Sequence, residues 1–295
     1  MCHVFNRRLQ TISWPLAAIW LTSFLPGTAL AQDNSEMFSV ALGADTTHAY
    51  LFRGIAQETS GSIFQPYAEI GIHLANVDLI VGQWNSLHSG PTGASQRLDL
   101  LAERPHTTKM WYESDFYSGV SFDLLNNLEA DVTYTSYLSP NNSFGTIKEV
   151  ALGLTMDDSD FWLDHLFGNF SLSPHILVAV ELSGQADGGA SEGSYLELGI
   201  EPGFELETGT VSISFPTNVG FSLSNYYEDG GHMNDTFGFF EIGVLAALPL
   251  TMPSGYGSWE ITAGIKVVRL GPYLEALNRS DGSQLVGSGG FGVSF

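Results

Sequence analysis

Acidic side chains recur at every second position along several stretches of this 295-residue sequence. Glu113 and Asp115 share one face of such a stretch, and Phe116 and Val120 share the other. Asp and Glu number 32 against 10 Lys and Arg, which gives a formal net charge of −22 at pH 7. If the acidic faces line an enclosed space, their carboxylates raise the local concentration of cations and repel anions. The same charge argues against nucleic acid as a partner.

The alternation assigns an inward position to most charged side chains. We expect a lumen lined by Asp45, Arg53, Glu69, Glu113, Asp115, Glu129, Asp131, Glu197, Glu201, Glu241, Glu260 and Lys266. A charge that faced lipid near mid-bilayer would cost roughly 2–4 kcal/mol for Lys or Arg, and somewhat less for Asp or Glu. The alternative is that these groups form a hydrogen-bonded filling of a narrow barrel instead of the lining of an open channel.

Arg53 is one of the few bases that can neutralise these acids. If the first strand continues through residues 50–54, Arg53 shares a face with Asp45 and Thr47 and points inward. An inward Arg binds carboxylates through its planar fork of donors. The alternative is that Arg53 reaches outward into the headgroup region beside Phe52.

Motifs typical of enzymes occur here only out of context. Residues 189–193 (Gly-Ala-Ser-Glu-Gly) match the nucleophile-elbow pattern but lie in a Gly-rich loop, not between a strand and a helix. Residues 287–292 match the dinucleotide-binding pattern, yet no helix follows them. The sequence singles out no Ser/His/acid set. We therefore expect no catalytic residues, no cofactor and no enzymatic activity.

Potential metal ligands are sparse as well. Asp187, Asp229 and Asp281 each precede a glycine, and His232 lies near the second of them. Such a group could ligate a divalent cation at the cell surface, but Asp-Gly pairs are also typical of turns. Cys2 is the only cysteine and lies in a segment that we expect to be removed, so we expect neither disulfides nor cysteine ligands. We expect no metal site.

The elements that would hold the acidic faces are strands, because the dominant periodicity from residue 38 onward is two. The alternating stretches are 38–54, 64–74, 77–84, 112–124, 128–138, 147–156, 170–182, 194–206, 211–225, 237–250, 257–270 and 284–295. An even number of antiparallel strands is typical of bacterial outer-membrane barrels. The sequence therefore predicts an all-β fold, an antiparallel transmembrane β-barrel of about 12 strands.

The lengths of the connections alternate between short turns and longer polar loops. The short turns are at 75–76, 125–127 and 207–210, and the longer loops are at 85–108, 183–193, 226–235 and 271–283. Short periplasmic turns and longer extracellular loops are the rule in outer-membrane barrels, whereas a soluble β-sandwich does not predict the alternation. Residues 157–169 are an exception, a long connection on the side that we expect to be periplasmic.

The start of the chain has the features of a secretory signal. Arg7 and Arg8 precede an apolar segment at 12–25, and Ala-Leu-Ala at 29–31 forms a cleavage pattern before Gln32. The alternative, a membrane anchor, fits less well because prolines interrupt the segment. We expect residues 1–31 to be a signal peptide and residues 32–295 to form the barrel.

The printed chain stops on Phe295, an aromatic residue at the end of an alternating strand. Lipid offers no hydrogen-bond partner to a backbone group, so a spanning sheet must close by pairing its last strand with its first. We expect Phe295 to take part in barrel closure. We also expect the terminal strand to be the segment through which the barrel-assembly machinery recognises the chain.

Several segments resemble an uncharacterised proteobacterial outer-membrane β-barrel family with an early Tyr-Leu-Phe-Arg-Gly segment. The first is Ala-Asp-Thr-Thr at 44–47 running into Tyr-Leu-Phe-Arg-Gly-Ile at 50–55. The others are residues 112–117 (Tyr-Glu-Ser-Asp-Phe-Tyr), 134–140 and 149–154. The resemblance implies an outer-membrane location and supplies no catalytic residues. The loop at 85–108 and the scarcity of Lys and Arg depart from the family pattern.

Three functional hypotheses follow from these observations. The leading one is a passive outer-membrane channel with an acidic, cation-preferring lumen, for which small solutes or cations are the partners. The second is a structural or surface-interaction barrel without an open pore, whose long loops contact other molecules. The third, a lipid-acting barrel enzyme, would need a Ser/His/acid set at the rim. In each case the outer-membrane lipid is the surrounding partner.

The topology can be tested with single cysteines placed in residues 85–108 and 226–235. Because these are long connections, we expect them to face the cell exterior. Such cysteines should react with a membrane-impermeant reagent in intact cells. Reaction only after disruption of the outer membrane would invert the assignment.

Overall fold

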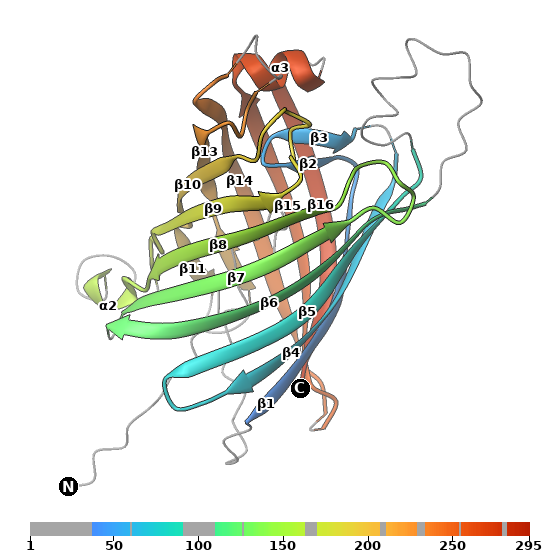
Figure 1. Ribbon diagram of the computed structural model, residues 1–295. Helices are drawn as coiled ribbons and strands as arrows, with labels where there is room; N and C mark the ends of the chain where they lie inside the picture. Colours follow the sequence, from blue (N-terminus) through green and yellow to red (C-terminus); the bar gives the residue numbers. More distant parts are fainter. Residues whose placement is uncertain are drawn as a thin grey trace, which may run out of the picture.

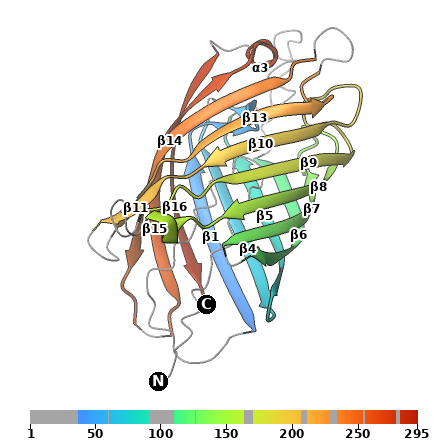
Figure 2. The same ribbon diagram turned by 90° about the vertical axis from the view of Figure 1, so that its left-hand side faces the viewer.

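The computed structural model is a barrel of antiparallel strands that closes on itself, seen from two sides in Figures 1 and 2. The structure describes residues 37–59, 61–90, 110–125, 127–162, 170–206, 211–228, 234–253, 255–278 and 282–295. The predicted signal peptide, residues 1–31, lies outside these residues. The pairing of β14 (Phe237–Leu250) with β15 (Ser258–Leu270) completes the ring.

Twelve strands form the ring, as the sequence predicts. The others are β1 (Phe38–Thr47), β4 (Ile63–His73), β5 (Val77–His88), β6 (Trp111–Leu125), β7 (Leu128–Leu138), β8 (Ile147–Met156), β9 (His175–Ser183), β10 (Ser194–Ile200), β13 (Thr217–Ser224) and β16 (Ser283–Ser294). Two short strands lengthen the wall: β11 (Gly203–Leu206) continues β10, and β12 (Val211–Ser214) precedes β13. Every pairing in the ring is antiparallel.

Two strands that were expected to be continuous are each divided at a proline. The predicted strand 194–206 divides at Pro202, and the predicted strand 211–225 divides at Pro216. Proline has no N–H to donate to a sheet ladder, so each ladder is interrupted there. The backbone N–H of Phe215 donates to the carbonyl of Pro202 at 2.8 Å, so the two breaks lie side by side in the wall.

The first and last strands pair directly. The register of β1 and β16 runs from Ala41 opposite Ser294 to Thr47 opposite Ser288. The N–H of Phe295 donates to the carbonyl of Val40 at 2.9 Å, and the N–H of Val40 donates to the carbonyl of Phe295 at 3.2 Å. The last residue therefore adds one reciprocal pair of hydrogen bonds to the seam.

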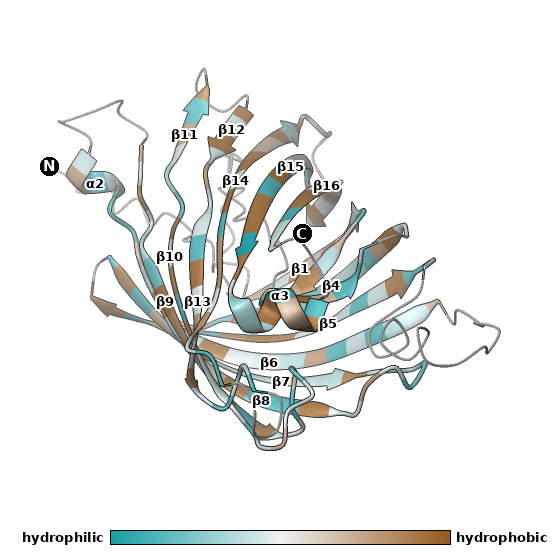
Figure 3. Ribbon diagram, turned by 90° about the horizontal axis from the view of Figure 1, so that it is seen from above, coloured by the Kyte–Doolittle hydropathy of each residue, from teal (hydrophilic) through white to brown (hydrophobic). Residues whose placement is uncertain are grey.

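Apolar and polar residues alternate along the strands, which Figure 3 shows as brown and teal bands. Val81, Ile70 and Leu182 project outward and are 63%, 53% and 55% exposed, whereas Asp131 and Thr133 on the inner face are almost fully buried. An outer surface of this kind is compatible with lipid and not with water. The protein is therefore a transmembrane barrel of the bacterial outer membrane.

The two ends of the barrel differ. The end that carries α3 (Pro272–Asn278) also carries the connections β5–β6, β7–β8, β9–β10 and β13–β14, and is the extracellular end. The opposite end carries the β4–β5 turn, the C-terminus and α2 (Ser159–Trp162), which lies in the long connection between β8 and β9. No helix among the described residues is long and apolar enough to cross a membrane.

The first strand does not continue through residues 50–54, and that expectation was wrong. β1 ends at Thr47, and the chain forms a separate hairpin of β2 (Tyr50–Phe52) and β3 (Ile55–Glu58). Arg53 and Gly54 form its two-residue turn with φ values of 47° and 81°. Turns with both central residues at positive φ match the twist of a hairpin, and glycine adopts that conformation without a steric penalty.

The hairpin lies inside the ring near the extracellular end and is apolar on both faces. Ala49, Leu51 and Ile55 belong to a hydrophobic cluster that includes Tyr195 from β10 and Phe239 from β14. On its other face, the hairpin joins a second cluster through Tyr50 and Phe52, packed with Trp84, Tyr117 and Tyr137 from β5, β6 and β7. The two clusters join the hairpin to opposite walls near the extracellular end of the barrel.

Two predicted boundaries also require correction. The loop expected at 85–108 begins later, because β5 runs to His88; residues 91–109 lie outside the described part. The strand expected at 170–182 begins only at His175, because Pro174 cannot donate to the ladder and Ser173 has a φ of 46°.

Deletion of Phe295 tests how much the terminal pairing contributes to assembly. The deletion removes the two hydrogen bonds to Val40, and we expect it to lower the amount of heat-modifiable, folded barrel while export across the inner membrane is unchanged. Semi-native electrophoresis of outer-membrane fractions measures the folded fraction. An unchanged folded fraction would show that Phe295 is dispensable for closure.

Candidate functional site

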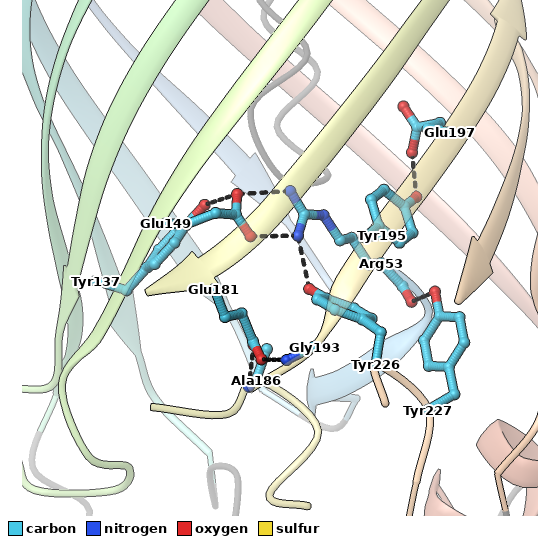
Figure 4. A network of polar contacts seen from close by, with 10 residues as sticks. All are labelled: Arg53, Tyr137, Glu149, Glu181, Ala186, Gly193, Tyr195, Glu197, Tyr226 and Tyr227. Carbon is cyan, nitrogen blue, oxygen red and sulfur yellow. Dashed lines mark hydrogen bonds and ion pairs between the residues drawn. The ribbon is translucent and has the colours of Figure 1, made fainter. Parts of the chain in front are cut away.

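The turn of the β2–β3 hairpin places Arg53 at the centre of a buried polar network (Figure 4). Its Nη1 donates to Glu149 Oε2 at 2.6 Å, and its Nη2 donates to Glu149 Oε1 at 2.8 Å. Nη1 also donates to the hydroxyl of Tyr226 at 2.7 Å, and the hydroxyl of Tyr137 donates to Glu149 Oε1 at 3.2 Å. The guanidinium and the carboxylate thus meet in a bidentate pair supported by two phenols.

Aromatic rings surround the same guanidinium. Its carbon lies 4.2 Å from the ring centroid of Tyr195, 5.1 Å from that of Phe52 and 5.3 Å from that of Tyr226. Arg53 is only 2% exposed, so these cation–π contacts act away from water, where they are strongest. The inward position and the carboxylate partner expected for Arg53 are present, but through the hairpin turn and not through a face of β1.

Extracellular segments hold the hairpin turn in place. The hydroxyl of Tyr227 donates to the carbonyl of Arg53 at 3.0 Å. Asn278 at the end of α3 donates through Nδ2 to the carbonyl of Gly54 at 2.7 Å and accepts the N–H of Ala56 at 2.9 Å. A Cβ at Gly54 would lie 2.6 Å from a methyl carbon of Leu274, so glycine is also required by the close approach of α3.

The extracellular connections are tied to one another by carboxylates that accept backbone N–H groups. Glu181 accepts the N–H groups of Ala186 and Gly193, each at 2.7 Å. Asp187 accepts the N–H groups of Gly189 and Glu228, also at 2.7 Å, and burial raises its pKa to about 6. Asp187 is therefore engaged in turn and loop contacts. The other candidate metal ligands, Asp229, His232 and Asp281, lie outside the described residues.

A second polar group lies where the hairpin meets β5. The Oγ of Ser86 is 2.7 Å from His88 Nε2, and His88 Nδ1 is 3.2 Å from Glu58 Oε2. All three residues are fully buried, and burial raises the pKa of Glu58 to about 7. The sequence alone did not predict this group. Ser86 and His88 are two residues apart on one strand and so share a face, but nothing local connects Glu58 with them.

Lys266 and several predicted acidic residues form a network on the periplasmic side of the hairpin. Lys266 Nζ donates to Glu241 Oε2 at 2.8 Å, and Asn218 Nδ2 donates to Glu241 Oε1 at 3.1 Å. His175 Nε2 lies 3.0 Å from Asn218 Oδ1, and Tyr195 donates to Glu197 at 2.5 Å. Lys266, Glu241, Asn218 and His175 thus form a chain of contacts across β15, β14, β13 and β9, and the Tyr195–Glu197 pair lies on β10, the strand between β13 and β9.

The remaining predicted lining residues lie along the same inner face. Glu201 accepts from Ser214 at 2.7 Å, and Glu69 accepts from Tyr117 at 3.0 Å. Asp45, Glu129, Asp131 and Glu260 share this face with them, and Glu113 and Asp115 are buried beside Tyr50 and Trp84 of the hairpin–wall contact. Arg53, Glu113, Asp115, Asp131, Glu260 and Lys266 of the predicted set are buried, whereas the other members are partly exposed.

The closed ring, the apolar exterior and the acidic interior define a porin-like β-barrel of the bacterial outer membrane. No protein-family model and no curated protein matches the chain. The chain is similar in structure to the NanC porin, with a TM-score of 0.46 and 10% identity over 85% of this chain and 98% of that one. LpxR from Salmonella typhimurium gives a TM-score of 0.47 and 10% identity over 86% of this chain and 99% of that one.

An outer-membrane channel from Pseudomonas putida F1 gives a TM-score of 0.41 and 9% identity, over 90% of this chain and 100% of that one. Likenesses of this size do not bear on the solute or the activity of this chain. Those questions depend on the side chains inside its own barrel.

Replacement of Arg53 by Ala tests the buried pair. The change leaves the Glu149 carboxylate buried without its cation, and we expect it to lower the free energy of unfolding by about 3–5 kcal/mol. Urea titration of the folded barrel in lipid vesicles measures the change. Arg269→Ala is the matched control: Arg269 is 61% exposed and 3.7 Å from Glu275, so about 1 kcal/mol or less is expected.

The double variant Arg53→Ala/Glu149→Gln extends the test. Because it removes both charges, it should be less destabilised than the sum of the two single variants. Additive effects would show that the two side chains do not stabilise the barrel as a pair.

Proposed function

We propose that this protein is an outer-membrane channel with a cation-preferring lumen, which the β2–β3 hairpin closes at its extracellular half in the conformation described. The acidic inner wall is the observation that carries the proposal. Among the described residues of the ring, the inner face carries the carboxylates of Asp45, Glu69, Glu113, Asp115, Glu129, Asp131, Glu149, Glu181, Glu197, Glu241 and Glu260. Of the Lys and Arg residues in the described ring strands, Lys266 lies on this face and pairs with Glu241 at 2.8 Å, whereas Lys148 and Arg269 project outward. Such a wall attracts cations and repels anions.

Ring size is compatible with a conducting lumen. Barrels of about 8 strands are filled by their own side chains, and those of about 16 leave an aqueous channel. Twelve strands lie between these limits, and here an internal hairpin supplies additional filling in one half only. Below the hairpin, Glu129, Glu197 and Glu201 remain partly exposed, which supports an aqueous acidic vestibule open toward the periplasm.

A barrel without an open pore, acting as a structural or surface-interaction protein, is the second candidate. The observation in its favour is the pair of hydrophobic clusters on both faces of the hairpin, since displacement of the hairpin would expose both. The hydrogen bonds that join the connection at residues 184–193 to the connection at residues 225–228 also fit a surface with a fixed shape. This candidate needs no solute to pass.

Membership of the uncharacterised proteobacterial family rests on residues 44–55, 112–117, 134–140 and 149–154 and stays a prediction. So does the role of the barrel-assembly machinery as a partner. The expectation of no enzymatic activity is tested separately, by covalent labelling of Ser86. A channel of the proposed kind requires binding and exclusion of ions but no covalent step.

Conductance in planar bilayers tests the proposal. The wild-type protein should open rarely, whereas a variant with residues 49–58 replaced by a short Gly-Ser linker should conduct steadily. In a KCl gradient, its reversal potential should show a preference for K⁺ over Cl⁻. Glu129→Gln combined with Asp131→Asn should weaken that preference, and Asp160→Asn on α2, an exposed acid outside the lumen, should leave it unchanged.

A folded hairpin-deletion barrel that does not conduct would contradict the channel and favour the closed structural barrel. A conducting variant that prefers Cl⁻ would contradict the role of the acidic wall. The folded state of each variant is checked by heat modifiability before recording.

A further inference from the structure

We propose that Ser86, His88 and Glu58 form a nucleophilic triad that hydrolyses a small carboxylic ester reaching the extracellular mouth of the barrel. The Oγ of Ser86 lies 2.7 Å from His88 Nε2, within the distance at which a base accepts the proton of a nucleophile. The other ring nitrogen of His88 lies 3.2 Å from the carboxylate of Glu58. Nucleophile, base and orienting acid thus stand in the order that Ser/His/acid hydrolases use.

The surroundings fix the orientation of the imidazole. The ring of His88 stacks on Tyr112 with centroids 4.4 Å apart and planes 17° apart, and the edge of Tyr50 lies perpendicular to it at 6.0 Å. Gln65 Nε2 donates to the Oγ of Ser86 at 3.3 Å, which leaves the hydroxyl proton for His88 Nε2. The other proton of the imidazole is then on Nδ1, which lies 3.2 Å from Glu58 Oε2; this is the tautomer required of a general base.

Several polar atoms of this group lack hydrogen-bond partners. Among the described residues, both carboxylate oxygens of Glu58 and the Nδ1 of His88 have no well-aligned hydrogen bond, although all are buried. Buried polar atoms without aligned partners cost stability and are uncommon. Such a cost is expected where side chains are held for chemistry instead of for packing.

The proposed step is acyl transfer to water. Ser86 Oγ attacks the ester carbonyl carbon while its proton passes to His88 Nε2. The C–O bond to the alcohol then breaks, and the alcohol leaves with that proton. A water molecule gives its proton to His88, attacks the acyl carbon and releases the carboxylic acid, and Ser86 takes the proton back. Glu58 touches neither reacting atom and serves as a positioning residue.

The group is fully buried at the extracellular end of the wall. Ile63 pairs with His88 at the end of β4 and β5, so the triad lies at the last rung of the wall. The cover over Glu58 is glycine backbone: a Cβ at Gly61 or at Gly90 would collide with its carboxylate. Because Glu58, Ser86 and His88 are all fully buried, entry of the ester requires displacement of this glycine backbone.

The test is covalent labelling by a small alkyl fluorophosphonate, in which a serine oxygen displaces fluoride from phosphorus. Folded full-length protein in detergent is treated at pH 8, above the pKa of about 7 at Glu58, and mapped by mass spectrometry. We expect the label on Ser86 and competition by p-nitrophenyl butyrate. His88→Gln should slow labelling by about 100-fold or more. Ser121→Ala, which removes another buried serine, should have no effect.

In Glu58→Gln the glutamine side chain has the shape of glutamate but no charge, so this variant should slow labelling by about tenfold or more. Glu58→Asp keeps the charge and should retain more of the rate. A merely structural role would leave the Gln variant labelling at the wild-type rate. All rates refer to the heat-modifiable fraction, so loss of folding is not mistaken for loss of reactivity.

Absence of label on Ser86 in folded wild-type protein would overturn the proposal without the need for any variant. Label on Ser86 that persists in His88→Gln would overturn it as well. Neither result affects the conductance experiment, because the channel does not depend on the triad.

Discussion

The structure depends on one buried contact, the bidentate pair between Arg53 on the internal hairpin and Glu149 on the barrel wall. Both side chains are about 2% exposed, so either charge alone would carry a large desolvation penalty. Together they are matched in geometry and supported by phenols from β7 and from the β13–β14 connection. The pair therefore specifies where the hairpin turn must lie. A displaced hairpin would leave the Arg53 guanidinium and the Glu149 carboxylate without each other as partners.

The remaining architecture follows from placing that pair inside a membrane barrel. Lipid on the outside requires a closed ring, and the closed ring leaves a polar interior that must be either hydrated or filled. In the extracellular half, the hairpin fills it with two hydrophobic clusters, fastened by Asn278 and Tyr227. In the periplasmic half, carboxylates are left partly exposed around the Lys266–Glu241 pair. The hydrophobic clusters and the partly exposed carboxylates thus lie in different halves of the barrel.

The ring was predictable from the sequence because the bilayer imposes a strict alternation, so that Phe116 and Glu113 had to face opposite ways. The hairpin was not, because residues 49–52 are buried on both sides and a doubly buried segment has no alternation to read. The Arg53-Gly54 turn was the available signal. The inward charges, including Glu69 and Glu241, were placed by parity alone. The contact of Glu58 with His88 could not be predicted from the sequence, since it depends on how the hairpin docks against β5.

Hydrogen exchange of the β2–β3 backbone amides tests the central claim, that the hairpin is locked in the lumen, most directly. The folded protein in lipid nanodiscs is exchanged in D₂O and followed by mass spectrometry of peptides that cover residues 49–58. If the hairpin is held by Arg53 and by the two hydrophobic clusters, its amides exchange as slowly as those of β7 and β8. Exchange of these peptides within seconds, while the ring strands remain protected, would contradict the account.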